Sequence, residues 1–206
     1  MNRFRAFLGW IGCVLALFCA AAPASAQYTE DERFLAGLRA RRLFDLAEEV
    51  CRRRLTASNL TSRQRVVLTV ERMLNLTEKG VNATLAERPK AFEAAREIAR
   101  EYLQNYRDES YGVLVRFQDA LTVLTAGELQ RLEAELGASS PQEIEAARTT
   151  LREAVNLLEA FDRDLEKLLP EARQAPKGSK SITVEELTAM RTHVGYQLAR
   201  AARNQA

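Results

Sequence analysis

The feature that most constrains this chain is the segment over about 109–169, which carries two long apolar stripes at helical spacing. In its second half, eight apolar residues recur at alternating steps of three and four: Ile144, Ala147, Leu151, Ala154, Leu158, Phe161, Leu165 and Leu168. Its first half carries a less regular stripe: Leu114, Phe117, Leu121, Leu124, Leu129, Leu132 and Leu136. This periodicity predicts two long helices, each about 40 Å long at a rise of about 1.5 Å per residue.

The residues between the two stripes predict a single short turn. Gly137 suits the left-handed position that follows the end of a helix. Ser140, Pro141 and Glu143 fit the N-cap, the first helical position and the third helical position of a capping box. Two striped helices joined by so short a turn predict a long antiparallel helical hairpin over 107–170.

Shorter helices are predicted before the hairpin, in residues 27–106. Apolar residues at helical spacing place them from about 30, 43, 61 and 89 onward. The third is expected to open at Ser58 or Asn59 and to end at Gly80. The run Arg52–Arg54 falls in the last turn of the second helix, where cations face the negative end of the helix dipole. We therefore interpret this run as a solvated turn rather than a nucleic-acid patch.

The region after the hairpin is predicted to hold a linker and one more helix. Pro170 is expected to stop the second arm, and 171–182 is a short polar linker. Thr183 and Glu186 form another capping box, which opens a helix over 183–206. Because no glycine, proline or C-cap follows that helix, we favour the interpretation that the chain is the front of a longer protein.

No segment alternates apolar and polar residues with period two, so no strand is predicted and the expected fold class is all-α. Hydrophobic residues make up 47% of the chain and charged residues 28%, which is the composition of a globular protein.

Residues 1–26 are predicted to be a cleaved signal peptide. Arg3 and Arg5 form a basic start, an apolar run follows, and Ala24-Ser25-Ala26 gives the small residues that precede a cleavage site. A retained transmembrane anchor is the competing interpretation, in which the protein is a membrane-tethered stalk. The apolar run of about 17 residues is short for a membrane span, so we expect an exported protein, periplasmic or extracellular.

Removal of the signal leaves a chain of balanced charge. The full sequence has 30 basic and 28 acidic residues, and the signal contains two arginines and no acid. The mature part therefore has 28 of each, which argues against a nucleic-acid partner and against membrane binding once the signal is cleaved. Cys51 is the only cysteine that remains. A single cysteine cannot form an intramolecular disulfide, and the position of Cys51 on an apolar helix face predicts a buried thiol.

The sequence contains no convincing catalytic, cofactor-binding or metal-binding residues. His193 is the only histidine, which is too few for a zinc site or for a serine nucleophile with its base. Carboxylates such as Glu128 and Asp162 alternate with basic residues such as Arg131 and Arg163, as on a solvated helix face. We therefore expect a protein that is not an enzyme and that has no cofactor and no metal.

Three short stretches share the form aromatic, two residues, alanine. They are Phe44-Asp45-Leu46-Ala47, Phe92-Glu93-Ala94-Ala95 and Tyr196-Gln197-Leu198-Ala199. The residues around the first stretch resemble half of a tetratricopeptide repeat, and 182–206 resembles the start of another. The chain thus resembles divergent tetratricopeptide-repeat-like helical proteins exported by bacteria. The resemblance implies a helical scaffold that binds peptides or proteins along a groove, with no catalytic residue to transfer.

These observations lead to one functional hypothesis and one alternative. The hypothesis is an exported, non-enzymatic scaffold or adaptor, with helical repeats around the long hairpin and a protein or peptide as its partner. Two hairpins could also pair into a four-helix bundle, so a homo-oligomer is an open possibility. The alternative is the N-terminal docking region of a larger enzyme whose catalytic domain lies beyond residue 206.

Overall fold

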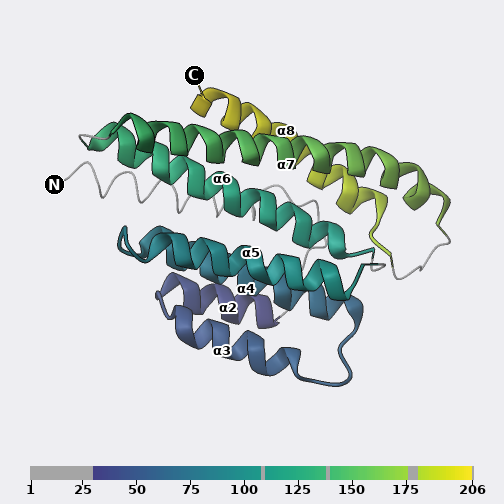
Figure 1. The fold of residues 1–206 in the computed structure, drawn as a ribbon. Coiled ribbons are helices and arrows are strands. Elements are labelled where there is room, and N and C mark those ends of the chain that lie inside the picture. The colour runs from purple at the N-terminus through teal and green to yellow at the C-terminus, as the bar shows by residue number, and fades with distance from the viewer. Residues whose placement is uncertain (1–29, 108–109, 138–139, 176–180, 206) are drawn as a thin grey trace. The chain divides into compact units, whose positions relative to one another are not determined.

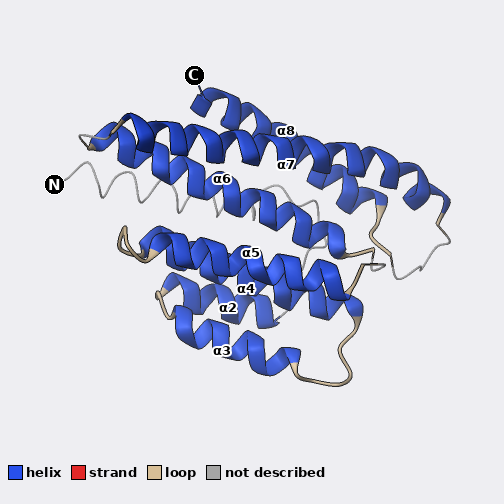
Figure 2. Ribbon diagram, in the orientation of Figure 1, coloured by secondary structure: helices blue, strands red, loops and turns tan. Residues whose placement is uncertain are grey.

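The computed structural model describes residues 30–107, 110–137, 140–175 and 181–205, and all regular structure in these ranges is helical (Figures 1 and 2). The helices are α2 (Glu30–Ala40), α3 (Phe44–Leu55), α4 (Ser62–Asn82), α5 (Arg88–Asn105), α6 (Gly112–Leu136), α7 (Pro141–Gln174) and α8 (Val184–Gln205). The all-α prediction is confirmed for the described residues. The predicted signal segment, 1–26, lies outside them.

The chain divides into two compact units, residues 1–36 and 37–206, so that α2 contributes to both. In the second unit, α4 packs against α3, α5 and α6, and α6 packs in turn against α5, α7 and α8. Helix α8 lies mainly along α7 (Figure 1). Helices α4 and α6 are therefore the central elements of this unit, each with several neighbours.

The most extensive packing in the second unit is between α6 and α7. The rings of Phe117 and Phe161 stack with their centroids 5.0 Å apart and their planes 13° from parallel. Ten residues further along α6, a Cβ on Gly127 would lie only 3.0 Å from side-chain atoms of Leu151. Leu151, Leu158 and Leu165 of α7 are fully buried. The absence of a side chain at Gly127 thus lets the two helices approach closely.

The stripe predicted for α6 is only partly correct. Phe117 and Leu124 are buried as expected, but so are Val113, Val115 and Val123, whereas Leu136 is 65% exposed. The reason is that α6 packs against α4, α5, α7 and α8, so more than one face is buried in the middle of the helix. At the C-terminal end of α6, residues such as Leu136 stay exposed. The α7 stripe is closer to expectation, with Ala147 to Leu165 buried and Ile144 exposed.

Local signals placed most helix starts correctly. Ser140 and Glu143 form the predicted capping box, with Pro141 in the first turn of α7. Thr183 and Glu186 exchange backbone-to-side-chain hydrogen bonds of 2.9 and 3.2 Å at the start of α8. The predicted cap of α4 is wrong, because Thr61, with Gln64 as its capping-box partner, opens that helix instead of Ser58 or Asn59.

Two predicted helix ends, at Gly80 and Pro170, are wrong, and at a third, Gly137, the end is correct but the predicted backbone conformation is wrong. Gly80 lies inside α4. A Cβ at this position would lie only 3.3 Å from side-chain atoms of Ala91 and Phe92, so the absence of a side chain lets these residues of α5 pack against α4. Gly137 ends α6 in extended backbone, with φ −106° and ψ 171°, instead of the left-handed region. Pro170 lies inside α7, which continues to Gln174. The buried Leu169 beside the proline holds this last stretch in place despite the missing backbone donor. The predicted linker therefore begins later than expected, and 176–180 lies outside the described residues.

Candidate functional site

Polar side chains that the sequence analysis considered as possible catalytic groups form ion pairs between helices in the structure. Asp162 accepts from Nε of Arg191 of α8 at 3.2 Å, and Glu166 pairs with the same arginine. Glu128 of α6 pairs with Arg200 of α8 and accepts from Nδ2 of Asn204 at 2.5 Å. No group of three or more potential metal ligands is found in the described part of the chain.

The solvated-face interpretation is wrong for Glu128. Its side chain is only 16% exposed, and burial raises its pKa while the guanidinium of Arg200 opposes that rise. The error arose because the partner lies 72 positions away on α8, and local charge alternation gives no sign of such a partner. Arg200 and Glu128 together tie α8 to α6.

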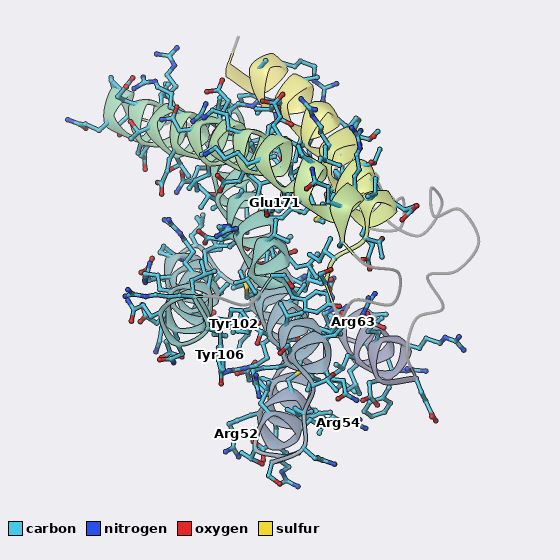
Figure 3. All side chains as sticks on the ribbon, turned by 90° about the vertical axis from the view of Figure 1, so that its right-hand side faces the viewer. Arg52, Arg54, Arg63, Tyr102, Tyr106 and Glu171 are labelled. Atoms are coloured by element: carbon cyan, nitrogen blue, oxygen red, sulfur yellow. The ribbon has the colours of Figure 1, made fainter. Side chains whose placement is uncertain are left out.

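The arginine run at the end of α3 has the solvated character predicted for it. Arg52, Arg53 and Arg54 are exposed in the last turn of α3, and Glu49 pairs with the first two at 2.7 and 2.5 Å. Figure 3 shows the side chains of Arg52 and Arg54 directed outward from α3. These contacts within one helix match the expected charge complement of a helix C-terminus.

The predicted buried thiol is also present. Cys51 of α3 is fully buried, and burial raises its pKa to about 12, with Glu71 and Glu48 raising it further. A thiol with such a pKa has almost no thiolate at neutral pH and is a poor nucleophile.

Three large apolar side chains near the α4/α5 and α6/α7 connections are exposed. Leu85, in the connection between α4 and α5, is 68% exposed; Leu136, the last residue of α6, is 65% exposed; and Ile144, in α7, is 38% exposed. Leu129, Glu133 and Leu136 follow one another at helical spacing, so they share a face of α6. We call Leu85, Leu136, Ile144 and the hollow described next the tip surface.

The tip surface includes a small hollow between the start of α5 and the C-terminal half of α6. Its volume is about 60 Å³, and its walls are formed by Leu85, Arg88, Pro89, Phe92, Ala126, Leu129, Gln130 and Glu133. A cavity of about 150 Å³ is what holds a benzene molecule. The hollow therefore suits one aliphatic side chain or a few waters, and it is too small for an organic cofactor.

One wall of the hollow is a partly buried ion pair between two helices. Arg88 of α5 pairs with Glu133 of α6, and its Nε also donates to the backbone oxygen of Gly80 at 3.3 Å. Burial lowers the pKa of Arg88, but a guanidinium stays charged in proteins. The pair fixes the wall and leaves a polar rim beside an apolar floor.

The floor of the hollow depends on Gly80. Its position allows the ring of Phe92 to approach the backbone of α4. The turn before α5 is held by Thr84, whose hydroxyl donates to Glu87 at 2.8 Å and whose carbonyl accepts from the backbone N–H of Arg88 at 3.0 Å. These hydrogen bonds hold the connection that carries Leu85 against the start of α5.

Sequence reasoning did not identify the tip surface. The sequence predicts no regular structure between the expected helix end at Gly80 and the next helix start near 89, and it places Leu136 on an apolar stripe. The one available signal was Leu85, a single large apolar residue between Thr84 and Glu87 in an otherwise small or polar connection. Nothing local indicates that this leucine lies beside Glu133, almost fifty positions later in the chain.

Among the described helices, none combines the length and the apolar content needed to cross a membrane. Comparison with family models, with curated proteins and with solved structures found no match for this chain.

Proposed function

We propose that this chain is a helical scaffold that works without catalysis and binds a protein partner through the tip surface. The observation that carries this proposal is that the exposed Leu85 lines a hollow of side-chain size, and that the exposed Leu136 shares a face of α6 with Leu129 and Glu133 of the hollow's wall. Contiguous exposed apolar side chains with a polar rim are typical of protein-interaction sites.

The α6/α7 pair provides the rigid support. We infer that these helices work as a long antiparallel hairpin, because their contacts advance along α6 from Phe117 to Gly127 while they recede along α7 from Phe161 to Leu151. The turn between them then carries Leu136 and Ile144 on a stiff base. A stiff base favours binding because little conformational freedom is lost on association.

The expected affinity is modest. Full burial of a leucine or isoleucine side chain contributes about 1.5–3 kcal/mol, whereas association costs about 4–15 kcal/mol. Leu85, Leu136 and Ile144 alone would hardly offset that cost. We therefore expect the partner to present its own apolar side chain to the hollow and polar groups to Arg88 and Glu133.

Export, and the likeness to tetratricopeptide repeats, stay predictions from the sequence. In the first aromatic-x-x-alanine stretch Phe44 and Ala47 are buried, whereas in the last one Tyr196 and Ala199 are exposed. Binding at the tip surface depends on neither prediction, because it involves a different part of the chain.

The test is site-specific photo-crosslinking in the native cell, followed by binding measurements with the captured partner. A photo-reactive residue at position 85 or 136 is expected to give one discrete adduct. The matched control is position 196 of α8, where Tyr196 is 56% exposed and where we expect no such adduct.

The binding measurement uses the double variant Leu85→Asp, Leu136→Asp. We expect it to weaken partner binding at least tenfold, or about 1.4 kcal/mol, with unchanged helicity and melting temperature because both residues are exposed. Tyr196→Asp is the control and should bind normally. Undiminished binding by the double variant, or an equal loss in the control, would rule out the tip surface.

A further inference from the structure

One side of helix α3 faces away from α4 and carries exposed apolar side chains. Phe44 and Glu48 both contact side chains of α4. Leu46 is two positions from each of them, which corresponds to about 200° around the helix, and it is 49% exposed. Val50 follows four positions later, so it shares a face with Leu46, and it is partly exposed.

The start of α3 adds a third exposed apolar side chain. Leu43 occupies the N-cap of the helix, forms no side-chain cap bond and is 44% exposed, although serine, threonine, aspartate and asparagine are the residues that stabilise this position. Arg42 before it has a φ of 58°, in a region that residues with a side chain rarely adopt. Departures from local preference are expected at functional sites. We call Leu43, Leu46 and Val50 the α3 face.

The charges beside the α3 face are separated by sign along the helix. The acidic residues of α3 lie in its first half, and the basic residues, Arg52 to Arg54, lie in its last turn. The side chain of Asp45 is 91% exposed and that of Arg53 is 76% exposed. The helix dipole explains this order of signs, but it does not explain the exposed leucine between them.

This arrangement is complementary to a second copy of itself when the two helices run antiparallel. The acidic half of each copy then faces the basic half of the other, whereas parallel helices would set like charges against each other. A two-fold axis satisfies both ends at once, because the same patch is used on both copies. Asp45 and Arg52 have nearly the same midpoint along α3 as Leu46 and Val50. One axis therefore brings acid to base and leucine to valine.

The ion pairs that these side chains already form do not prevent such a contact. Asp45 pairs with Lys79 of α4 at 2.6 Å. Glu49 pairs with Arg52 and Arg53 of its own helix at 2.7 and 2.5 Å. Pairs as exposed as these contribute little, so they can be exchanged for pairs with a second copy.

We propose that the α3 face is a self-association surface, through which two copies of this chain pair with their α3 helices antiparallel. Helix α3 has 12 residues and is about 18 Å long, so the contact is small. Interfaces that bury less than about 1,200 Å² belong to weak, transient complexes, so we expect a dissociation constant in the micromolar range or weaker.

The proposal goes beyond partner binding at the tip surface and does not depend on it. Each dimer would carry two tip surfaces, so a partner with two suitably spaced sites would bind more tightly than a partner with one.

The first test is sedimentation equilibrium of the whole protein. We expect a reversible monomer–dimer equilibrium over concentrations up to about 1 mM. Leu46→Asp places a carboxylate in the apolar part of the contact and should weaken dimerisation at least tenfold. The matched control is Tyr196→Asp on α8, where the tyrosine is 56% exposed and where dimerisation should be unchanged. Helicity and melting temperature should match wild type in both variants, because both positions are exposed.

The second test reverses the charges of one half of α3 at a time. One variant combines Asp45→Arg with Glu49→Arg, and the other combines Arg52→Glu with Arg53→Glu. Each alone should stay monomeric, because both halves of its α3 then have the same sign. An equimolar mixture should form heterodimers, since each reversed half meets a half of opposite sign. A wild type that is monomeric up to about 1 mM, a reversed variant that still dimerises, or a mixture without heterodimers would overturn the proposal.

Discussion

Two interfaces of the second unit, α6/α7 and α3/α4, differ in the polarity of the contacts described here. Between α6 and α7 lie stacked aromatic rings, fully buried leucines and a glycine contact. Between α3 and α4 lies a polar layer, in which Nδ2 of the buried Asn75 donates to the carbonyl of Phe44 at 2.8 Å and Arg72 pairs with Glu48.

The polar layer is incompletely satisfied within the described residues, because Oε2 of Glu48 and Oδ1 of Asn75 are buried without a hydrogen-bond partner there. Buried apolar contacts are the main source of stability, whereas unsatisfied buried polar atoms are costly. We infer that α6/α7 carries most of the stability of this unit and that α3 is the more easily detached helix.

The largest expected effect comes from placing a charge in the apolar interface. Leu158→Asp buries a carboxylate with no partner in the middle of α7, and we expect it to cost more than about 4 kcal/mol, which is enough to unfold many domains of this size. Circular dichroism and chemical denaturation measure the loss. The control is Ala160→Asp, an exposed position two residues away, which should change stability by less than about 1 kcal/mol. A folded Leu158→Asp with normal melting would show that this stripe is not core.

A smaller loss is expected in the polar layer. Asn75→Ala removes the hydrogen bond to Phe44, and we expect a cost of about 1–3 kcal/mol, read from the urea midpoint. Asn156 is an exposed asparagine of α7, so Asn156→Ala should stay within about 0.5 kcal/mol of wild type. If Asn75→Ala cost as much as Leu158→Asp, the two interfaces would not differ as described.

The pH dependence of the α3/α4 interface has a definite sign. The pKa of the Cys51 thiol is raised from 9.0 to about 12 in the folded protein, so the unfolded chain loses this proton first. Stability from this group is therefore complete below pH 9 and falls as pH rises toward 12, by about 1.4 kcal/mol at pH 10. The measurement is the difference in urea stability between wild type and Cys51→Ala at pH 8 and pH 10. An unchanged difference would mean that the thiol is not buried in the folded state.

The smallest effects are expected from two glycines inside helices, with opposite signs. In Gly127→Ala the new methyl group would meet Leu151 at 3.0 Å; we expect an overpacking cost of about 1–3 kcal/mol, offset by about 1 kcal/mol of helix propensity. Gly195→Ala meets nothing within 4 Å and should stabilise by about 0.5–1 kcal/mol. Thermal melting separates the two. A stabilising Gly127→Ala would indicate looser packing between α6 and α7.

Local sequence determined the helices and most of their starts, because capping boxes such as Ser140 with Glu143 involve residues three positions apart. It failed where a distant residue decides the outcome. Gly80 is typical of a helix end, yet it lies inside α4, where Phe92 packs against it. Pro170 is also typical of a helix end, yet α7 continues to Gln174, and Leu169 beside the proline is buried.

The tip surface lay beyond sequence reasoning for the same reason. Leu85 and Glu133 come from separate segments, and no periodicity relates them. The partly buried ion pair of Glu128 and Arg200 was missed because the alternation of charges along α6 suggested a solvent-exposed face. The contact of the His193 ring with Phe117 likewise joins residues that are far apart in the sequence.

The burial of Asn75 also has a consequence for protein production. Asn59-Leu60-Thr61, Asn75-Leu76-Thr77 and Asn82-Ala83-Thr84 all fit the acceptor sequence for N-linked glycans. Asn59 and Asn82 are exposed, whereas the amide of Asn75 is engaged inside the fold. In a eukaryotic secretory host, a glycan at Asn75 can be attached only before α4 packs. The fraction of molecules with a glycan at Asn75 would therefore measure how many were glycosylated before they folded. In those molecules the glycan would prevent α3 from packing on α4.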